Sequence, residues 1–368
     1  MKKIIIAFLL FGLLSPFIGK GQGCMEGDSD EGVQVVGYLQ ADYDNVFFDT
    51  DKNGNTLNKP NSFYFKRARI GVLGSIPYDV SYYVMAELSP VIQGTPFLLD
   101  AFITYAPFGK YAKFTIGQFK SPVGLELNTP CHALHTIRRS TVVNNLATPF
   151  RDMGFMIFGS TDTLFGKKDF LKYSVAILNG TGLNHWDDNK YKDIAARLVI
   201  SPWEWLSIGG SYRTGKQDIK KTDQIQKTRT RYGGDISIEF NNFLIQGEYL
   251  AGVDEGKVTS GGGCGGKSTS AAPDSLTFNK NGFFVQAMYM TPWRIQPVIK
   301  YEMYNPDNTT YRYLYVEQDF VQTTLTFGIN YFLNEWTRIQ INYLYNAEET
   351  GDVEFPNDAI LFQVQAKF

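Results

Sequence analysis

The sequence predicts an all-β protein: a transmembrane antiparallel β-barrel of about sixteen strands, with short periplasmic turns and long external loops. Three observations predict it. Apolar and polar residues alternate with a period of two, short and long connections alternate along the chain, and aromatic residues are abundant. The 368 residues include 22 Tyr and 28 Phe, which favour strands, and the formal net charge is −2. This small charge, without a basic stripe, argues against nucleic acid as a partner.

The beginning of the chain has the features of a secretory signal peptide. Two lysines precede an apolar run at residues 4–14, which is too short for a spanning helix. We therefore expect residues 1–23 to be removed, which leaves residues 24–368 as a single barrel domain. Cys24 would be lipidated if it lay at a lipoprotein cleavage site, and ordinary cleavage nearby is the alternative.

The rest of the chain lacks a candidate transmembrane helix, because no later stretch has about 18 consecutive apolar residues. An exported chain of this kind is periplasmic, secreted or an outer-membrane barrel. The three cysteines are too few for a disulfide framework.

The alternation is clear in several segments. Residues 229–240 and 243–250 flank a two-residue Asn-Asn turn and predict a hairpin. In residues 360–368, alternate positions from Ile360 to Phe368 are apolar and the others are Gln or Lys, with Leu361 as the exception. A charged side chain facing lipid costs several kcal/mol, so the polar face must contact water.

The connections favour a membrane barrel over a soluble sandwich, because sandwiches rarely keep a short and long rhythm throughout. An even number of strands, each of about 9 to 13 residues, closes such a sheet without an edge. Short turns are expected at 75–79, 106–110, 201–204, 241–242, 291–294 and 332–336, and long connections near 45–62, 120–150, 180–190, 215–229, 252–280, 305–317 and 347–357.

A barrel of about sixteen strands leaves an aqueous channel, so passage of solutes rather than catalysis is the expected function. Its selectivity would come from charges near the narrowest point and from a loop folded into the lumen. The long central connection at 120–150 suits that role, since loops of this length are usually functional or disordered and its apolar content favours packing. Several cations lie in this connection or at strand positions that the alternation directs toward the lumen. They are Arg67, Arg69, Lys120, Arg138, Arg139, Arg151, Arg197, Arg213, Arg231, Arg294, Lys300 and Arg338.

These cations have three interpretations. Each could pair with an inward carboxylate, anchor the loop, or contact an anion, since guanidinium groups bind phosphate and carboxylate oxygens bidentately. The candidate partner carboxylates are Asp100, Asp235, Glu239, Glu248 and Glu302.

Catalysis and metal binding have weaker support. A catalytic nucleophile needs a nearby base, and His132, His135 and His185 all lie in expected loops. The CHALH stretch at 131–135 lacks a full set of metal ligands. We therefore predict no catalytic residue, no metal and no cofactor.

Several segments together resemble the phosphate-selective porin O and P family, over about residues 33–213, with the C-terminal half matching as generic barrel strands. The resemblance implies a sixteen-stranded outer-membrane porin, usually a homotrimer surrounded by outer-membrane lipid, whose third external loop narrows the pore. It also implies that the terminal Phe368 is recognised by the barrel-assembly machinery. The matching segments are 65–74, 99–105, 115–126, 138–140, 150–159, 178–184 and 192–203.

The resemblance implies a basic constriction formed by Arg67, Arg69, Lys120, Arg138, Arg139 and Arg151, to which the strand phase adds Arg197. The expected function is passive diffusion of small solutes, in particular anions such as phosphate, across the outer membrane of a Gram-negative type cell. A general diffusion porin without anion preference is the alternative, followed by a barrel enzyme or a plugged structural barrel.

Overall fold

A computed structural model of the chain describes residues 32–47, 61–92, 94–161, 163–164, 167–218, 226–255, 277–306, 321–349 and 357–368. The predicted signal peptide, Cys24 and Cys264 lie outside these ranges.

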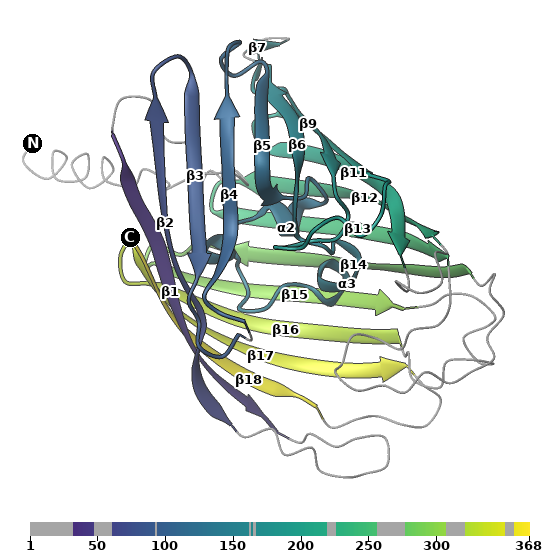
Figure 1. Cartoon of the computed structure of the whole chain (residues 1–368). Coiled ribbons are helices and arrows are strands. Elements are labelled where there is room, and N and C mark those ends of the chain that lie inside the picture. The colour runs from purple at the N-terminus through teal and green to yellow at the C-terminus, as the bar shows by residue number, and fades with distance from the viewer. Residues whose placement is uncertain are drawn as a thin grey trace, which may run out of the picture.

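The described residues form a closed antiparallel barrel in which each strand pairs with its neighbours in the chain and the last strand pairs with the first (Figure 1). The sixteen barrel strands are β1 (Gln34–Val46), β2 (Ser62–Ile76), β3 (Val80–Glu87), β4 (Phe97–Tyr105), β5 (Lys113–Lys120), β6 (Arg151–Ser160), β9 (Leu171–Leu178), β10 (Asp193–Trp203), β11 (Leu206–Asp218), β12 (Gln226–Phe240), β13 (Phe243–Glu255), β14 (Thr277–Tyr289), β15 (Ile295–Asn305), β16 (Val321–Phe332), β17 (Thr337–Glu349) and β18 (Ala359–Lys367). The predicted barrel fold is therefore confirmed.

The connections give the barrel two different ends. One end, which we call the turn end, has the short connections, such as 77–79 and 241–242. The other, the loop end, has the long ones, such as 121–150 and 256–276. In outer-membrane barrels the short turns are periplasmic, which assigns the turn end to the periplasm.

Two details differ from the expected connections. The predicted long connection at 215–229 is mostly strand, because β11 continues to Asp218 and β12 begins at Gln226. A turn-end connection at 161–170, which the sequence reading missed, contains a two-stranded hairpin of β7 (Thr163–Leu164) and β8 (Lys167–Lys168).

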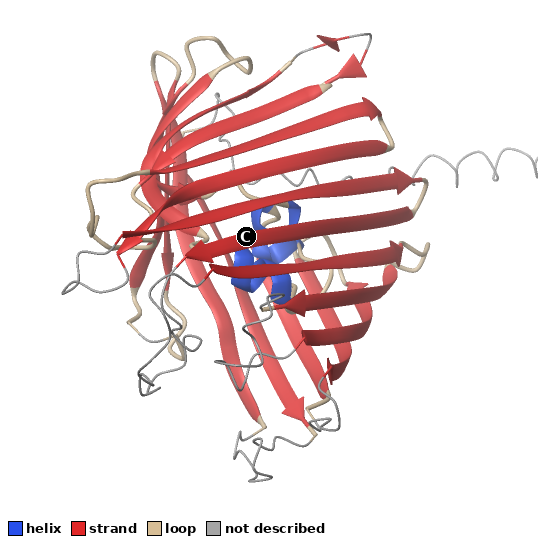
Figure 2. Ribbon diagram, turned by 90° about the vertical axis from the view of Figure 1, so that its right-hand side faces the viewer, coloured by secondary structure: helices blue, strands red, loops and turns tan. Residues whose placement is uncertain are grey.

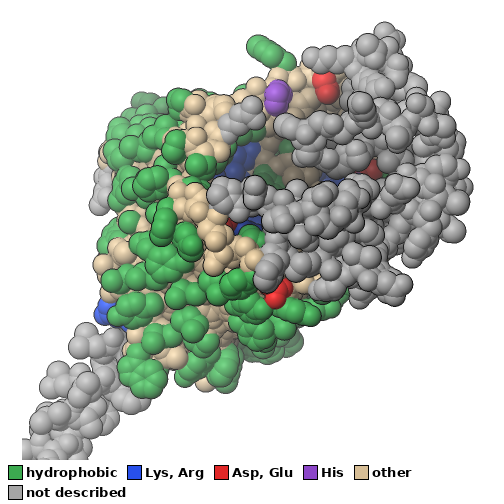
Figure 3. All heavy atoms as spheres, turned by 90° about the horizontal axis from the view of Figure 1, so that it is seen from below, with side chains coloured by type: hydrophobic (Ala, Val, Ile, Leu, Met, Phe, Trp, Pro, Cys, Tyr) green, Lys and Arg blue, Asp and Glu red, His purple; other side chains and the backbone are tan. Residues whose placement is uncertain are grey.

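The two faces of the wall follow the alternation. In β18, Ile360 and Val364 are exposed on the outer face, whereas Gln363 and Gln365 are buried on the lumen side. Hydrophobic side chains cover much of the outer surface, and Lys and Arg side chains are visible in the hollow inside it (Figure 3). Among the described residues, no helix is long and apolar enough to cross a membrane.

Tryptophans mark the turn end. Trp203 ends β10 and Trp205 lies in the turn before β11, with ring centroids 5.4 Å apart, and Trp293 and Trp336 lie in two further turns. All four are exposed. This is the position of an interfacial aromatic girdle.

The connection between β5 and β6 contains the described helices. We call residues 121–150 the inner segment; it includes α2 (Leu125–Asn128), the 3-10 helix η1 (Cys131–Ala133) and α3 (Thr141–Leu146). These short helices lie inside the ring of strands (Figure 2). Many side chains of the inner segment are buried. The two strands that the segment connects, β5 and β6, pair directly with each other.

Candidate functional site in the barrel lumen

The inner segment crosses the lumen because its backbone binds the far walls. The N–H of Glu126 donates to Glu248 Oε2 on β13 at 2.8 Å, and the N–H of Ile137 donates to Asn342 Oδ1 on β17 at 2.8 Å. On β18, the Gln365 side chain donates to the carbonyl of His132 at 3.1 Å. These bonds satisfy backbone groups that a loop taken out of water would otherwise leave unpaired.

Apolar packing fixes the other side of the segment. Val142, Val143 and Leu146 of α3 belong to one buried cluster with Phe119 of β5 and Phe284 of β14. Burying side chains of this size contributes about 1.5–3 kcal/mol each. The cluster therefore holds α3 against the wall.

Five of the seven predicted site residues gather around the thiol of Cys131 in η1. The Sγ atom lies 3.4 Å from Nη1 of Arg69 and 3.2 Å from Nη1 of Arg139. Lys120 and Arg151 face each other at the end of the β5–β6 pair. We call Arg67, Arg69, Lys120, Arg139 and Arg151 the basic cluster.

The cluster changes the acidity of the thiol that it surrounds. Burial raises the pKa of Cys131, but the charges of Arg139, Arg67, Arg69 and Lys120 outweigh it and hold the pKa well below its ordinary value. The cluster therefore favours an anion at its centre.

Two cations of the cluster are already paired. Arg69 Nε lies 2.6 Å from Glu87 Oε2, and Arg151 donates to both oxygens of Asp100 at 2.8 and 3.0 Å. These contacts fit the interpretation of the arginines as paired wall residues.

The other three have no carboxylate partner among the described residues. Arg67 donates to Gln40 Oε1 at 2.7 Å. Lys120 Nζ and Arg139 Nη2 share the carbonyl of Thr129, at 3.3 and 2.7 Å. The cluster thus keeps an excess of positive charge.

Arg138 and Arg197, the remaining predicted site residues, lie apart from the cluster. Arg138 bridges from the inner segment to Asp44 on β1 at 2.6 Å, with 41% of its side chain exposed. Arg197 donates to both oxygens of Asp235 at 2.5 and 2.8 Å. Each is paired with a carboxylate.

Arg294 was predicted to face the lumen, and the structure contradicts this. It lies in the turn before β15, with a positive φ of 62°, and is exposed. Its guanidinium donates to the carbonyl of Leu333 in the next turn at 2.9 Å. The alternation was extended one residue too far, into a turn.

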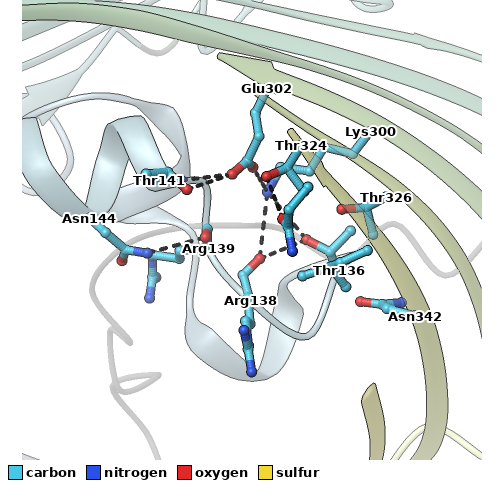
Figure 4. Close-up of a pocket in the computed structure, with 12 residues that line it drawn as sticks. Thr136, Arg138, Arg139, Thr141, Asn144, Lys300, Glu302, Thr324, Thr326 and Asn342 are labelled. Carbon is cyan, nitrogen blue, oxygen red and sulfur yellow. Dashed lines mark hydrogen bonds and ion pairs between the residues drawn. The ribbon is translucent and has the colours of Figure 1, made fainter. Parts of the chain in front are cut away.

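A second polar group was not predicted as a unit. Lys300 of β15 lies 3.2 Å from both Glu126 of the inner segment and Glu302 of its own strand. Glu302 also accepts hydrogen bonds from Thr141, the first residue of α3 (Figure 4). Sequence alternation marks Lys300 and Glu302 as inward, but the pairing with Glu126 spans 174 positions and leaves no local signal.

Two cavities lie beside the inner segment. A cavity of about 230 Å³ on the loop-end side is lined by Arg138, Lys300, Glu302 and several Thr and Asn residues (Figure 4). A cavity of about 540 Å³ at the turn end is lined by members of the basic cluster.

The histidines give no sign of catalysis or metal binding. Burial lowers the pKa of His132 and of His135 to about 4, so both are neutral near pH 7. Over the described ranges, the one side-chain hydrogen bond of a His ring is that of His135 with Gln296, and no group of three His, Cys, Asp or Glu side chains could hold a metal ion.

Comparison with known families identifies the barrel. The family described as phosphate-selective porin O and P matches residues 33–365. The chain belongs to this family. As a porin it is an outer-membrane channel for small solutes, and the resemblance found in the sequence is confirmed.

Solved structures similar to this porin share its fold at low sequence identity. The anion-selective porin from Comamonas acidovorans aligns with a TM-score of 0.66 at 11% identity, covering 92% of this chain and 99% of that one. The outer membrane channel DcaP of Acinetobacter baumannii aligns with a TM-score of 0.61 at 14% identity, covering 94% and 100%. OmpT of Vibrio cholerae in its trimer form aligns with a TM-score of 0.60 at 11% identity, covering 91% and 99%. The search of curated proteins gave no match.

Proposed function

We propose that this porin passes small anions, such as phosphate, by passive diffusion across the outer membrane. The observation that supports an anion preference is the excess positive charge of the basic cluster. Only Arg69 and Arg151 of its five cations are paired with carboxylates within the described part of the chain. Cations lining a lumen with low-dielectric walls raise the local concentration of anions.

The predicted site residues take different parts in this proposal. Lys120 and Arg67 supply the uncompensated charge, and Arg139 faces the acidic thiol of Cys131. Arg69 and Arg151 are paired with Glu87 and Asp100. Arg138, half-exposed beside the loop-end cavity, would meet an anion that enters from outside. Arg197 is assigned to the wall, because its Nη1 and Nη2 both donate to Asp235.

A general diffusion porin without anion preference is the second candidate. It is favoured by the ion pairs of Arg138 and Arg197, which neutralise part of the lumen charge. The fold and the family are those of a channel. We infer from this family and fold that the protein is a channel and not an enzyme.

Export and assembly belong to the same proposal. We infer that residues 1–23 are a signal peptide and that residues 24–368 form the mature barrel, with the inner segment as its pore-narrowing loop. The mature chain would assemble as a homotrimer in outer-membrane lipid, with Phe368 as the signal for the barrel-assembly machinery. The trimer form of the Vibrio cholerae OmpT structure supports a trimer for this fold.

The decisive experiment is single-channel recording of the purified mature protein in planar bilayers under a KCl gradient. An anion channel gives a reversal potential toward that of chloride, and added phosphate lowers the chloride current by competing for the basic cluster. Equal permeability of K⁺ and Cl⁻ would favour the alternative of a general diffusion porin. A protein that shows no conductance would favour the alternative of a plugged structural barrel.

A further inference from the structure

The lumen wall at the turn end has an apolar patch that a water-filled channel does not need. Val84 and Ile103 are exposed on the outer face, so Tyr83, Met85 and Phe102 face the lumen. Lumen-facing positions of such barrels are usually polar, and local departures from the expected pattern tend to mark functional sites. The lumen-facing apolar patch consists of Val36, Tyr38, Leu73, Tyr83, Met85 and Phe102.

This patch and the basic cluster line the same cavity. The turn-end cavity of about 540 Å³ has Tyr83, Met85 and Phe102 in its wall, together with Lys120 and Arg151. Small-molecule sites have volumes of about 300–1,000 Å³ and combine an apolar lining with a few polar groups. The cavity has both properties.

Among the charged groups of the cavity, Lys120 favours an anion. The lining of the cavity includes four cations, Arg69, Lys120, Arg151 and Lys367, together with Asp100, the acidic thiol of Cys131 and the terminal carboxylate of Phe368. Arg151 already binds Asp100 bidentately, and Arg69 is paired with Glu87. Lys120 Nζ donates to the carbonyl oxygens of Leu127 and Thr129, and within the described residues it has no carboxylate partner. A solute carboxylate would supply the missing negative charge.

The apolar side favours a ring over a small hydrated ion. The ring centroids of Tyr83 and Phe102 are 5.4 Å apart, a spacing at which aromatic rings attract each other. The Tyr83 hydroxyl contacts Met85 Sδ at 3.4 Å, so this polar group is directed at a neighbour in the patch. Chloride or phosphate would leave this surface unused.

We propose that the turn-end cavity binds aromatic carboxylates, with the carboxylate at Lys120 and the ring against Tyr83 and Phe102. The proposal rests on the anion channel proposed above and names a class of solute for it. The lumen-facing apolar patch increases the affinity for the aromatic ring of the solute, and Lys120 selects a solute that carries a negative charge.

The test is calorimetric titration of the folded, detergent-solubilised porin with three probes: sodium benzoate, sodium acetate and benzyl alcohol. Benzoate should bind about tenfold or more tightly than acetate, because only benzoate buries a ring. Benzyl alcohol, which has the ring without the charge, should also bind more weakly than benzoate. Equal affinities for benzoate and acetate, or no binding of benzoate, would overturn the proposal.

Two matched substitutions test the location. Phe102→Ser should weaken benzoate binding about tenfold and leave acetate binding unchanged. Phe158→Ser is the control, since Phe158 lies on β6 outside the lining of this cavity. Lys120→Gln should weaken the binding of both anions. If Phe158→Ser weakens benzoate binding as much as Phe102→Ser, the location is wrong; gel mobility before and after heating checks that each variant is folded.

Failure of this proposal is distinct from failure of the anion channel. A wild-type channel that prefers chloride but binds benzoate no better than acetate keeps the channel proposal and removes the aromatic site. A protein that binds benzoate through Phe102 but shows no chloride preference keeps the site and removes the anion preference.

Discussion

Leu361 of the last strand packs with Ile137 of the inner segment in one buried cluster. Leu361 is the residue that broke the alternation of the final strand, because an apolar side chain stands there among the polar positions of the lumen face. The contact gives the physical reason: the inner segment covers this position, so its side chain does not meet water. An exception to the pattern therefore marks where the segment touches the wall.

This contact predicts the effect of Ile137→Ala. Removing a buried Ile side chain costs about 2–5 kcal/mol, which here would be lost from the anchoring of the inner segment. We expect a larger single-channel conductance and a weaker ion preference, measured in planar bilayers. Ile360→Ala, on the lipid face of the same strand, is the control and should leave both unchanged. An unaltered conductance in Ile137→Ala would contradict this anchoring role.

The buried Glu126 carboxylate predicts a change in protease sensitivity. It lies 3.2 Å from Lys300 and accepts a 2.8 Å hydrogen bond from the N–H of Ser140. Glu126→Gln removes one of the two carboxylates that pair with the buried Lys300, and so weakens the link between the inner segment and β15. Trypsin should then cut the folded barrel faster after Arg138 or Arg139, as identified by mass spectrometry. Glu204→Gln, in an exposed turn, is the matched control. Equal cutting rates in both variants would show that Glu126 does not hold the inner segment in place.

Lys120→Gln should reduce the anion preference. Removing one uncompensated charge changes the energy of a nearby anion by about 1 kcal/mol, or about fivefold in the permeability ratio of chloride to potassium. The reversal potential in a KCl gradient measures this ratio. Arg197→Gln is the control for an inward cation that is fully paired with Asp235. The same shift in both variants would mean that net lumen charge, and not the cluster, sets the preference.

The thiol of Cys131 should titrate at unusually low pH. The surrounding cations hold its pKa well below the ordinary value, against the opposing effect of burial. The difference in thiolate absorbance between the wild type and Cys131→Ser should therefore rise well below the ordinary thiol pKa of about 8.5. Because the other cysteines are present in both proteins, they cancel. A midpoint at or above the ordinary value would show that the cations do not surround the thiol.

The lowered pKa of His135 predicts acid sensitivity. Burial lowers the pKa from 6.5 to about 4, partly opposed by the hydrogen bond with Gln296. Between these two pH values the unfolded chain binds a proton that the folded protein excludes, so stability falls with falling pH, by up to about 3 kcal/mol. Above pH 6.5 the residue contributes no pH dependence.

The measurement for His135 is the unfolding temperature, read from gel mobility at neutral pH and at about pH 4. His135→Gln should lose less stability on acidification than the wild type. The control is His185→Gln, an exposed residue in the connection between β9 and β10, which should behave like the wild type. A wild-type barrel as stable at the lower pH as at neutral pH would contradict the burial of a neutral imidazole.

The wall of the barrel follows from sequence because its pattern is local. The period of two places Arg67 and Arg69 on the lumen side, and their contacts with Gln40 and Glu87 agree. Strand ends were less certain, as Arg294 shows. A turn residue next to a strand has the same neighbours in sequence as a strand residue, and only its positive φ distinguishes it.

The partners of the lumen residues could not be predicted, because pairing across the barrel depends on closure. Arg213 is one example: it reaches both Asp152 and Asp193, which belong to different strands. The apolar patch around Tyr83 was also missed. A period of two does not say which face is the lumen when both faces carry apolar side chains, as they do in β3.

The inner segment also determines the order in which the barrel can be completed. His132 contacts Gln365, a partner 233 positions later in the chain, and contacts of such long range form slowly because a large loop must close first. Neighbouring strands can pair one after another, but the inner segment cannot make its final contacts until the last strand has paired. We therefore expect a newly inserted barrel to pass through a stage in which it is an open, undiscriminating hole, and to become a filter only in its final step of maturation.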